Sequence, residues 1–318
     1  MEQFIARFDT RMKALVTGGA GFIGSNLVDQ LIDDGHDVFV FDDLSTGKVE
    51  NVNSKAWFEE RIDISSDTMR WYMSEFMRAN KIDTIFHLAA AARVQPSIED
   101  PLSFNETNVT GTLALLKAAV DNKVNRFIFS SSSSVYGDGA YTPTDENHPL
   151  NPMSPYGAQK LIGEIYCKQF YRTYGLRSTC LRYFNVYGER QLLEGAYTLV
   201  MGKFAQQILD GKRMTIRGDG EQRRDFIYVG DVVKANILAA TTEISAATRG
   251  KPINIGNGDN HSVNDIADML GGKRVYVDPV LEPKETLADN ATAKYLLEWE
   301  PTGNIEKWIE GYKKELGI

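Results

Sequence analysis

The sequence predicts an α/β fold in which a doubly wound parallel sheet is joined to a smaller C-terminal α/β lobe. Two observations support this prediction. Short, wholly apolar runs alternate with longer amphipathic stretches through the first half of the chain, and this alternation is typical of a parallel sheet covered by helices on both faces. The second half is less regular, and no Pro- or Ser-rich linker separates it from the first. We therefore expect two closely packed lobes with a ligand cleft between them.

The individual elements follow from the apolar periodicity. In the first half, short apolar runs predict strands at 13–17, 38–41, 84–87 and 126–129, and helical spacing predicts helices at 26–33, 69–79 and 112–121. In the second half, the same reasoning predicts helices at 201–209, 232–240, 263–270 and 305–315 and strands at 214–217, 252–255 and 274–277. We expect an N-terminal extension at 1–12, a dinucleotide-binding domain at 13–185 and mainly a second lobe at 186–318, with about 226–256 returning to the first domain.

Composition narrows the classes of function. The chain has 318 residues, of which 42% are hydrophobic and 25% are charged, so it can bury a sizeable core. Its formal net charge of −8 argues against nucleic acid as the main partner. No apolar run approaches the roughly 20 residues that span a bilayer, and no signal-peptide core is present. We expect a cytoplasmic protein in which Cys167 and Cys180 are reduced core thiols.

A glycine-rich turn follows the first strand directly. Gly18, Gly21 and Gly24 are spaced by three residues and precede a helix. Glycine allows a tight turn and close approach to a pyrophosphate, and the helix N-terminus points unpaired N–H groups at the charge. A tight turn without a ligand is the alternative. Asp42 ends the second strand about twenty residues on, where a carboxylate binds ribose hydroxyls and repels a 2′-phosphate. The glycine-rich turn together with Asp42 favours NAD over NADP.

A candidate acid–base set follows the strand expected at 126–129. A run of serines at 130–134 is followed by Tyr156 and Lys160, which share one helix face at a spacing of four. A nearby ammonium would lower the pKa of the phenol from about 10, so that Tyr156 could take a proton from a substrate hydroxyl. One serine hydroxyl would steady the same oxygen. The alternatives are that Tyr156 and Lys160 form an ordinary pair on a helix surface and that the serine run is a loop without a catalytic role.

Seven short sequence motifs, in this order along the chain, resemble those of one family. They are Thr17–Gly24, His87–Ala90, Asn108–Gly111, the Ser-Ser-Ser-Val-Tyr-Gly137 block, Tyr156–Lys160, Leu181–Asn185 and Arg224–Tyr228. The chain resembles the extended short-chain dehydrogenase/reductases, which have a Rossmann sheet, and among them the NAD-dependent nucleotide-sugar epimerases. The resemblance implies a catalytic set of Ser132, Tyr156 and Lys160, with Ser132 chosen by its offset from Val135 among four neighbouring serines. His87 is expected to be structural.

The resemblance also implies the binding residues. NAD would contact Gly18, Gly21, Phe22, Ile23, Gly24, Asp42, Asp63, Ile64, Leu88, Ala89, Ala90, Asn108, Tyr156, Lys160, Tyr183 and Phe184. The substrate, a nucleotide sugar with UDP as the expected nucleotide, would contact Ser132, Ser134, Asn185 and Arg224. No metal is implied. Two helices, around 113–120 and 162–171, match the pair that forms a four-helix interface in this family, so a homodimer is expected.

The residues after the family serine bear on the reaction. Dehydratases of this family carry Thr-Asp-Glu there, and decarboxylases carry an acid near the position of Ser134, whereas this chain has only hydroxyls. The resemblance then implies 4-epimerisation of a UDP-hexose, in which Tyr156 removes the C4 hydroxyl proton, NAD is recycled and the keto-sugar turns over. Glucose, N-acetylated and uronic forms stay open, as do decarboxylation, dehydration, reduction and a non-catalytic dinucleotide sensor.

The chain departs from the family at one phosphate contact. Relatives carry an arginine upstream of the Ala288-Asp289 pair, and this chain has none there. Lys284, Arg190 and Arg217 are the candidates to replace it.

Overall fold

The computed structural model describes residues 11–193, 198–243, 249–280 and 282–318. The expected N-terminal extension therefore lies outside the described residues except at its end. Arg11 pairs with Asp37, and Met12 is buried in the main core, where its carbonyl accepts the Asp37 N–H. Residue 12 is thus already part of the packed fold, because an apolar side chain at that position fits between the sheet and its covering helices.

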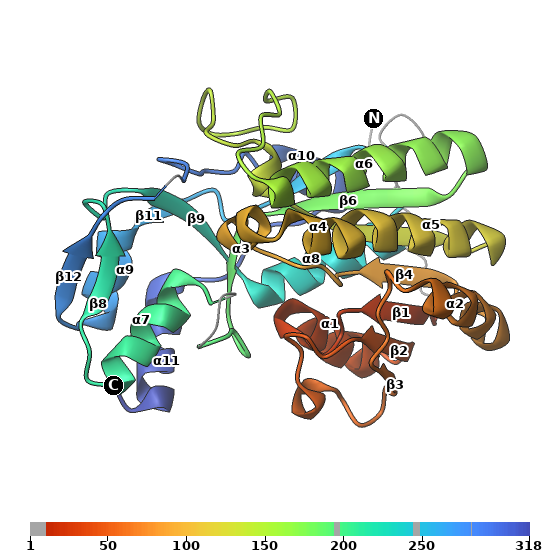
Figure 1. The fold of residues 1–318 in the computed structure, drawn as a ribbon, viewed down its shortest axis with the longest axis horizontal. Helices are drawn as coiled ribbons and strands as arrows, with labels where there is room; N and C mark the ends of the chain where they lie inside the picture. Colours follow the sequence, from red (N-terminus) through yellow and green to blue (C-terminus); the bar gives the residue numbers. More distant parts are fainter. Residues whose placement is uncertain (1–10, 194–197, 244–248, 281) are drawn as a thin grey trace.

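A seven-stranded, wholly parallel sheet forms the larger lobe (Figure 1). Its strand order is β10-β6-β5-β4-β1-β2-β3. The central strands carry apolar residues at nearly every position, since both faces are covered. The bounds are β1 Lys13–Thr17, β2 Asp37–Asp42, β3 Trp57–Glu60, β4 Thr84–His87, β5 Arg126–Ser132, β6 Arg177–Tyr183 and β10 Pro252–Ile255. The predicted doubly wound α/β fold is confirmed.

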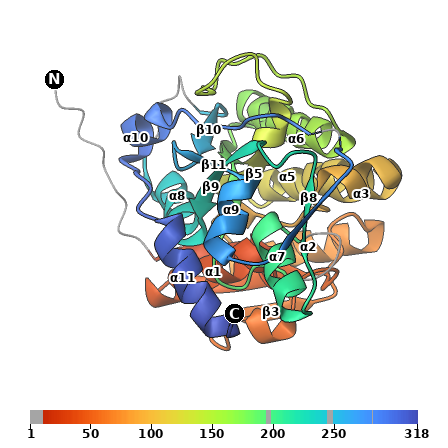
Figure 2. The same ribbon diagram turned by 90° about the vertical axis from the view of Figure 1, so that its left-hand side faces the viewer.

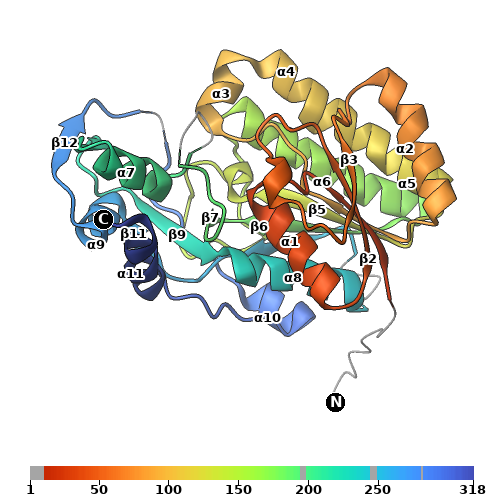
Figure 3. The ribbon, with the colours of Figure 1, turned by 90° about the horizontal axis from the view of Figure 1, so that it is seen from below.

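Helices cover both faces of this sheet (Figure 3). One layer contains α1 (Phe22–Asp33) and α8 (Val229–Thr241), which pack on each other. The other contains α2 (Asp67–Asn80), α5 (Thr112–Asp121) and α6 (Pro155–Tyr174). Short helices α3 (Val94–Glu99) and α4 (Pro101–Asn105) precede a π-helical turn at Glu106–Gly111 and lie against α6.

Local sequence fixes the ends of α6, which carries the expected catalytic pair. Ser154 caps its N-terminus by accepting the Gly157 N–H, and Pro155 occupies the first turn, where no N–H is needed. Gly175 ends it in a left-handed conformation with a φ of 75°. The twenty-residue helix therefore starts immediately before Tyr156, beside the end of β5.

The smaller lobe is built from two short sheets and three helices (Figure 2). One sheet orders β11-β9-β7 and the other pairs β12 with β8. The apolar faces of α7, α9 and α11 meet in a separate core that includes Phe204, Ile266 and Ile309. The bounds are β7 Asn185–Tyr187, α7 Val200–Leu209, β8 Met214–Arg217, β9 Arg223–Tyr228, β11 Asn260–Ser262, α9 Val263–Leu270, β12 Arg274–Val277 and α11 Ile305–Leu316. Helix α10 (Ala291–Leu297) packs on α8 and β10 of the larger lobe.

No helix within the described ranges is both long and apolar enough to cross a membrane. No cluster of three potential metal-ligating side chains occurs in that same part of the chain.

Candidate functional site

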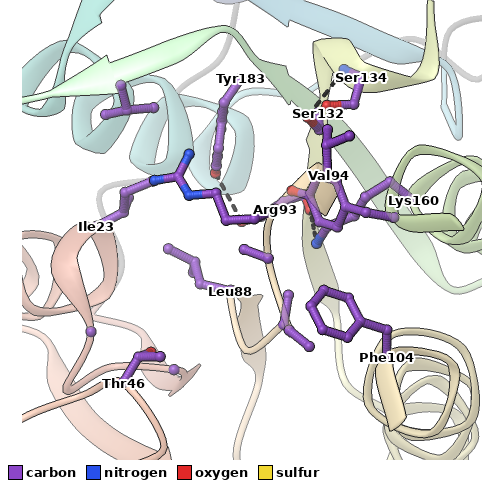
Figure 4. Close-up of a pocket in the computed structure, with 18 of the residues that line it drawn as sticks. Ile23, Thr46, Leu88, Arg93, Val94, Phe104, Ser132, Ser134, Lys160 and Tyr183 are labelled. Carbon is purple, nitrogen blue, oxygen red and sulfur yellow. Dashed lines mark hydrogen bonds between the residues drawn. The ribbon is translucent and has the colours of Figure 1, made fainter. Parts of the chain in front are cut away.

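A cleft of about 670 Å³ lies at the carboxyl ends of the central strands and reaches the smaller lobe (Figure 4). It brings together segments from β1, β2, β4, β5, α6, β6 and β9. Nearly all the site residues expected from the sequence line it. The exception is Asn108, which lies behind the lining in the π-helical turn, with its amide nitrogen donating to Ala91 O and Gln159 Oε1.

The glycine turn has the geometry of a phosphate cradle. Gly18 has a φ of +72°, and a Cβ added to it would lie 2.7 Å from the backbone nitrogen of Ala89. A Cβ on Gly24 would lie 2.1 Å from Gly18 O. The N-cap of α1 is Gly21, which offers no side-chain partner to the first N–H groups of the helix. These N–H groups can therefore bind an anion, and the residues fit a dinucleotide diphosphate.

Asp42 lies at the end of β2 in the same cleft. Its two carboxylate oxygens accept the backbone N–H groups of Ala20 and Leu44, at 2.9 and 2.8 Å. Burial raises the pKa of Asp42, and these two hydrogen bonds lower it. Each oxygen keeps a second acceptor position, so the carboxylate can still receive ribose hydroxyls. Asp63 and Ile64 lie in the same lining, after β3.

Tyr156 and Lys160 lie one turn apart at the start of α6, as expected. The Lys160 ammonium donates to the carbonyl of Ser130 at 2.7 Å and lies 5.9 Å from the centre of the Tyr156 ring. Burial lowers the pKa of Lys160 to about 8. Burial raises the pKa of Tyr156, and a hydrogen bond with Ser132 and the charge of Arg93 lower it. The groups that lower this pKa are thus Ser132 and Arg93, while the Lys160 ammonium donates to Ser130 O.

The serines of the 130–134 run have different partners. Ser130 is hydrogen-bonded to the Tyr183 hydroxyl at 3.0 Å, and Ser131 donates to Glu164 at 2.5 Å. Ser132 is the one that interacts with Tyr156, and it also accepts the backbone N–H of Ser134. Since the first two hydroxyls are engaged away from Tyr156, the geometry favours Ser132 as the hydroxyl that acts with the phenol.

Arg224 and Asn185 lie together at the other end of the cleft. Arg224 donates to Glu282 at 2.5 Å and to the carbonyl of Arg223, and burial lowers its pKa against the attraction of Glu282. Asn185 donates to the carbonyl of Asp225 at 3.2 Å. Asp225 is fully buried and accepts three backbone N–H groups, from residues 257, 258 and 288. The buried hydrogen bonds of Asp225 therefore fix the backbone position of the adjacent Arg224.

The candidates to replace the missing arginine lie elsewhere. Lys284 and Arg217 are exposed, and Arg190 pairs with Asp29. None of the three lines the cleft. A cationic side chain that was not expected from the sequence, Arg93, enters the cleft from the loop after β4. Its position directly beyond the His87–Ala90 block is the signal that could have identified it, because ligands bind at the carboxyl ends of parallel strands.

His87 has a structural environment. Its two ring nitrogens are hydrogen-bonded to Thr17 Oγ1 at 2.8 Å and Thr112 Oγ1 at 2.9 Å. Burial, with the nearby charge of Lys160, lowers its pKa to about 3. The ring is therefore neutral in the folded protein and links β1, β4 and α5 beneath the cleft, in agreement with the role expected from the sequence.

The sequence of this chain is similar to that of a known protein family. Residues 14–256 match the model of the NAD dependent epimerase/dehydratase family. The chain belongs to that family. Its cofactor is accordingly NAD, and the cradle and Asp42 described above are the residues that fit it. The similarity to nucleotide-sugar epimerases expected from the sequence is confirmed.

Individual relatives define how far the similarity extends. A UDP-glucose 4-epimerase structure from Thermotoga maritima, with UDP-glucose, is 39% identical, with a TM-score of 0.88 over 96% of this chain and all of that one. A UDP-glucose 4-epimerase of Mycolicibacterium smegmatis is 36% identical over 96% of this chain and 99% of its own length. UDP-glucuronic acid decarboxylase 1 of Xenopus tropicalis is 32% identical over 99% of this chain and 75% of its own length. The chain is therefore an enzyme of NAD-dependent nucleotide-sugar modification.

Proposed function

We propose that this enzyme is a 4-epimerase of a UDP-hexose, in the glucose, N-acetylated or uronic form. The observation that supports the proposal is the hydroxyl-only surface beside Tyr156. Residues 132–134 are all serines, and the acidic residues of the described lining are Asp42, Asp43, Asp63 and Glu282. Asp42 ends β2, Asp43 follows it, Asp63 follows β3, and Glu282 is paired with Arg224. Elimination of water needs an acid and a base at the sugar, and no carboxylate is placed there.

The proposed roles follow from the contacts. Tyr156 accepts the proton of the C4 hydroxyl and later returns it, while Ser132 hydrogen-bonds the phenol oxygen. Lys160 is buried one helical turn from Tyr156, and its ammonium donates to the carbonyl of Ser130. NAD supplies a hydride acceptor that is also the hydride donor of the return step. We also propose that residues 13–185 form the dinucleotide-binding domain, with about 226–256 added to it, and that the rest of 186–318 binds the substrate.

Epimerisation requires that the nucleotide be held firmly while the keto-sugar rotates, so that its other face meets the cofactor. Arg224 and Asn185 are the residues that we assign to the nucleotide diphosphate. A guanidinium suits this role because it presents a bidentate fork to phosphate oxygens. The lining that contains Ser132 and Ser134 also includes small side chains, among them Ala91 and Ala92. This space permits either face of the sugar ring to approach the cofactor.

The test is turnover without added cofactor. Purified protein is incubated separately with UDP-glucose, UDP-N-acetylglucosamine and UDP-glucuronate, and the anomeric signals are followed by proton NMR. We expect the C4 epimer of at least one sugar and no net NAD reduction. Tyr156→Phe should lower the rate by at least about a hundredfold, with Tyr141→Phe, an exposed tyrosine, as the control. A pentose product would instead show decarboxylation, loss of water a dehydratase, and consumption of NADH a reductase.

We further propose that the enzyme is a homodimer. Helices α3, α4 and α6 pack on one another and expose Ile98, Leu102 and Ile165 by 45%, 79% and 57%. Ile165 belongs to α6, one of the two helices for which the family resemblance implies an interface, and α3 and α4 pack beside that helix. Light scattering should give twice the chain mass, and Ile165→Glu together with Leu102→Glu should give the monomer. A monomeric wild-type protein at micromolar concentration would contradict the proposal.

A further inference from the structure

Arg93 has a backbone conformation that side chains rarely adopt. Its φ is 107° and its ψ is 143°, in a region occupied almost entirely by glycine. The residue lies between β4 and α3 and precedes the first residue of α3, Val94. That helix is anchored to the catalytic helix, since Ser97 Oγ accepts the backbone N–H of Tyr156 at 3.1 Å. A strained, non-glycine residue that neighbouring structure holds in place points to a function of its side chain.

The Arg93 side chain lies in the cleft. It extends from the loop across the cleft toward Ile23 and Tyr183 and away from Lys160 (Figure 4). Ile23 belongs to the first turn of α1 and lies between Gly21 and Gly24 of the glycine turn. Burial lowers the pKa of Arg93, and the electrostatic attraction of Tyr156 raises it. A guanidinium is costly to bury, and it gains most from carboxylate or phosphate oxygens, which it binds in a bidentate manner.

Within the described lining of the cleft, three side chains are cationic. The Lys160 ammonium donates to Ser130 O, and the Arg224 guanidinium donates to Glu282 and to the carbonyl of Arg223. Arg93 is the third, and it enters from the opposite lobe to Arg224. The surface cations considered as substitutes for the missing arginine do not reach the cleft. Arg93 is therefore placed to supply a second guanidinium to an anionic ligand.

We propose that Arg93 is a ligand-binding residue that recognises anionic oxygens of the molecules bound in this cleft. Three groups share that chemistry: the diphosphate of NAD, the diphosphate of a nucleotide sugar and a carboxylate on the sugar itself. The last two rest on the proposed function. The strained backbone of Arg93 directs the side chain into the cleft, at some loss of stability in the ligand-free protein.

Two pairs of variants test this proposal. Arg93→Gln removes the charge, and Arg93→Gly removes the charge and also relieves the backbone. Arg61 is the matched control, because it is also an arginine with a positive φ, of 62°, and it is exposed outside the cleft lining. Retained NAD is measured after dialysis, and the dissociation constants of UDP, UDP-glucose and UDP-glucuronate are measured by calorimetry. We expect Arg93→Gln to weaken at least one ligand by about tenfold or more, and Arg61→Gln to change none by more than about twofold.

The pattern of losses identifies the anion. Loss of NAD alone assigns Arg93 to the cofactor diphosphate, and equal weakening of UDP and UDP-glucose assigns it to the nucleotide diphosphate. A larger effect on UDP-glucuronate than on UDP-glucose assigns it to a sugar carboxylate. If Arg93→Gln weakens no ligand more than Arg61→Gln does, the proposal is overturned.

Thermal unfolding of the ligand-free protein tests the strain. Arg93→Gly should have a higher midpoint than Arg93→Gln, by more than the difference between Arg61→Gly and Arg61→Gln, since the conformation at Arg93 is the more restrictive. No difference would overturn the strain part of the argument. These readouts are independent of turnover, so a protein that binds through Arg93 yet converts no UDP-sugar would refute the proposed epimerase activity and leave the binding role intact.

Discussion

The buried ion pair of Glu164 and Arg182 leads to a quantitative prediction. Glu164 lies one turn beyond Lys160 in α6, and Arg182 lies in β6. The Arg182 Nε donates to one carboxylate oxygen at 2.8 Å and its terminal nitrogen to the other at 2.6 Å. Exposure of the two side chains is only 2% for Arg182 and 6% for Glu164. We consider the substitution Glu164→Gln, which keeps the shape of the side chain and removes its charge.

The magnitude follows from what remains after the substitution. Arg182 keeps its hydrogen bond to the Tyr136 hydroxyl, at 2.8 Å, and the electrostatic attraction of Glu146, but its buried charge loses the carboxylate in direct contact with it. Ser131 also loses its charged acceptor. Breaking a buried pair in this way costs about 3–5 kcal/mol, which corresponds to about 10² to 10⁴ in the folding equilibrium. The free energy of unfolding should therefore fall by about that amount.

The assay is urea unfolding followed by circular dichroism, with the free energy taken from the midpoint and slope. The control is Glu75→Gln, which removes an exposed pair with Arg78 and should change the free energy of unfolding far less, because water screens exposed charges. The double variant Glu164→Gln with Arg182→Met should recover part of the loss, because no unpaired charge remains. If Glu164→Gln is no more destabilising than Glu75→Gln, the electrostatic reasoning is wrong.

Three other substitutions test the site and its surroundings. Gly24→Ala would place a Cβ 2.1 Å from Gly18 O, so the purified protein should retain little NAD, whereas Gly311→Ala, which meets nothing within 4 Å, should retain it fully. Tyr156→Phe should lower turnover by at least about a hundredfold with unchanged UDP-sugar affinity, measured by NMR and calorimetry. The pKa of His87 is lowered from 6.5 to about 3, so the unfolded chain binds a proton there that the folded protein excludes, and stability should fall as the pH drops from about 6.5 toward 3. His87→Gln should flatten that dependence by up to about 1.4 kcal/mol per pH unit in urea titrations, and an unchanged slope would contradict this reading of His87.

Much of the fold could be predicted because its signals are local. The expected strands at 84–87, 214–217, 252–255 and 274–277 and the helices at 112–121 and 263–270 have the bounds found in the structure. These strands are short runs with β-branched or aromatic residues, and these helices carry apolar residues at helical spacing, so each can be identified from a few neighbouring positions. Strand β3 (Trp57–Glu60) was not predicted, because it lies at the sheet edge and carries no apolar run. Strand β9 was also missed, since its charged residues are paired by distant segments.

The same distinction applies to the candidate site. The glycine cradle, Asp42 and the Tyr156–Lys160 spacing can be identified because each lies within one turn or one helix. The pairing of Arg224 with Glu282 and the entry of Arg93 into the cleft depend on contacts between distant parts of the chain. The choice of Ser132 among adjacent serines also required the three-dimensional partners of each hydroxyl. Local spacing identifies the chemistry, and tertiary contacts determine which side chain performs it.

The last strand of the large sheet has a consequence for how the chain is made. Strand β10 (Pro252–Ile255) lies beside β6 (Arg177–Tyr183), yet it follows much of the smaller lobe in the sequence. While a ribosome synthesises the intervening segment, the backbone edge of β6 has no neighbour on that side. Such an edge can pair with other strands. A growing chain of this enzyme thus carries an open sheet edge until residue 255 emerges, and this interval is when a chaperone would protect it most.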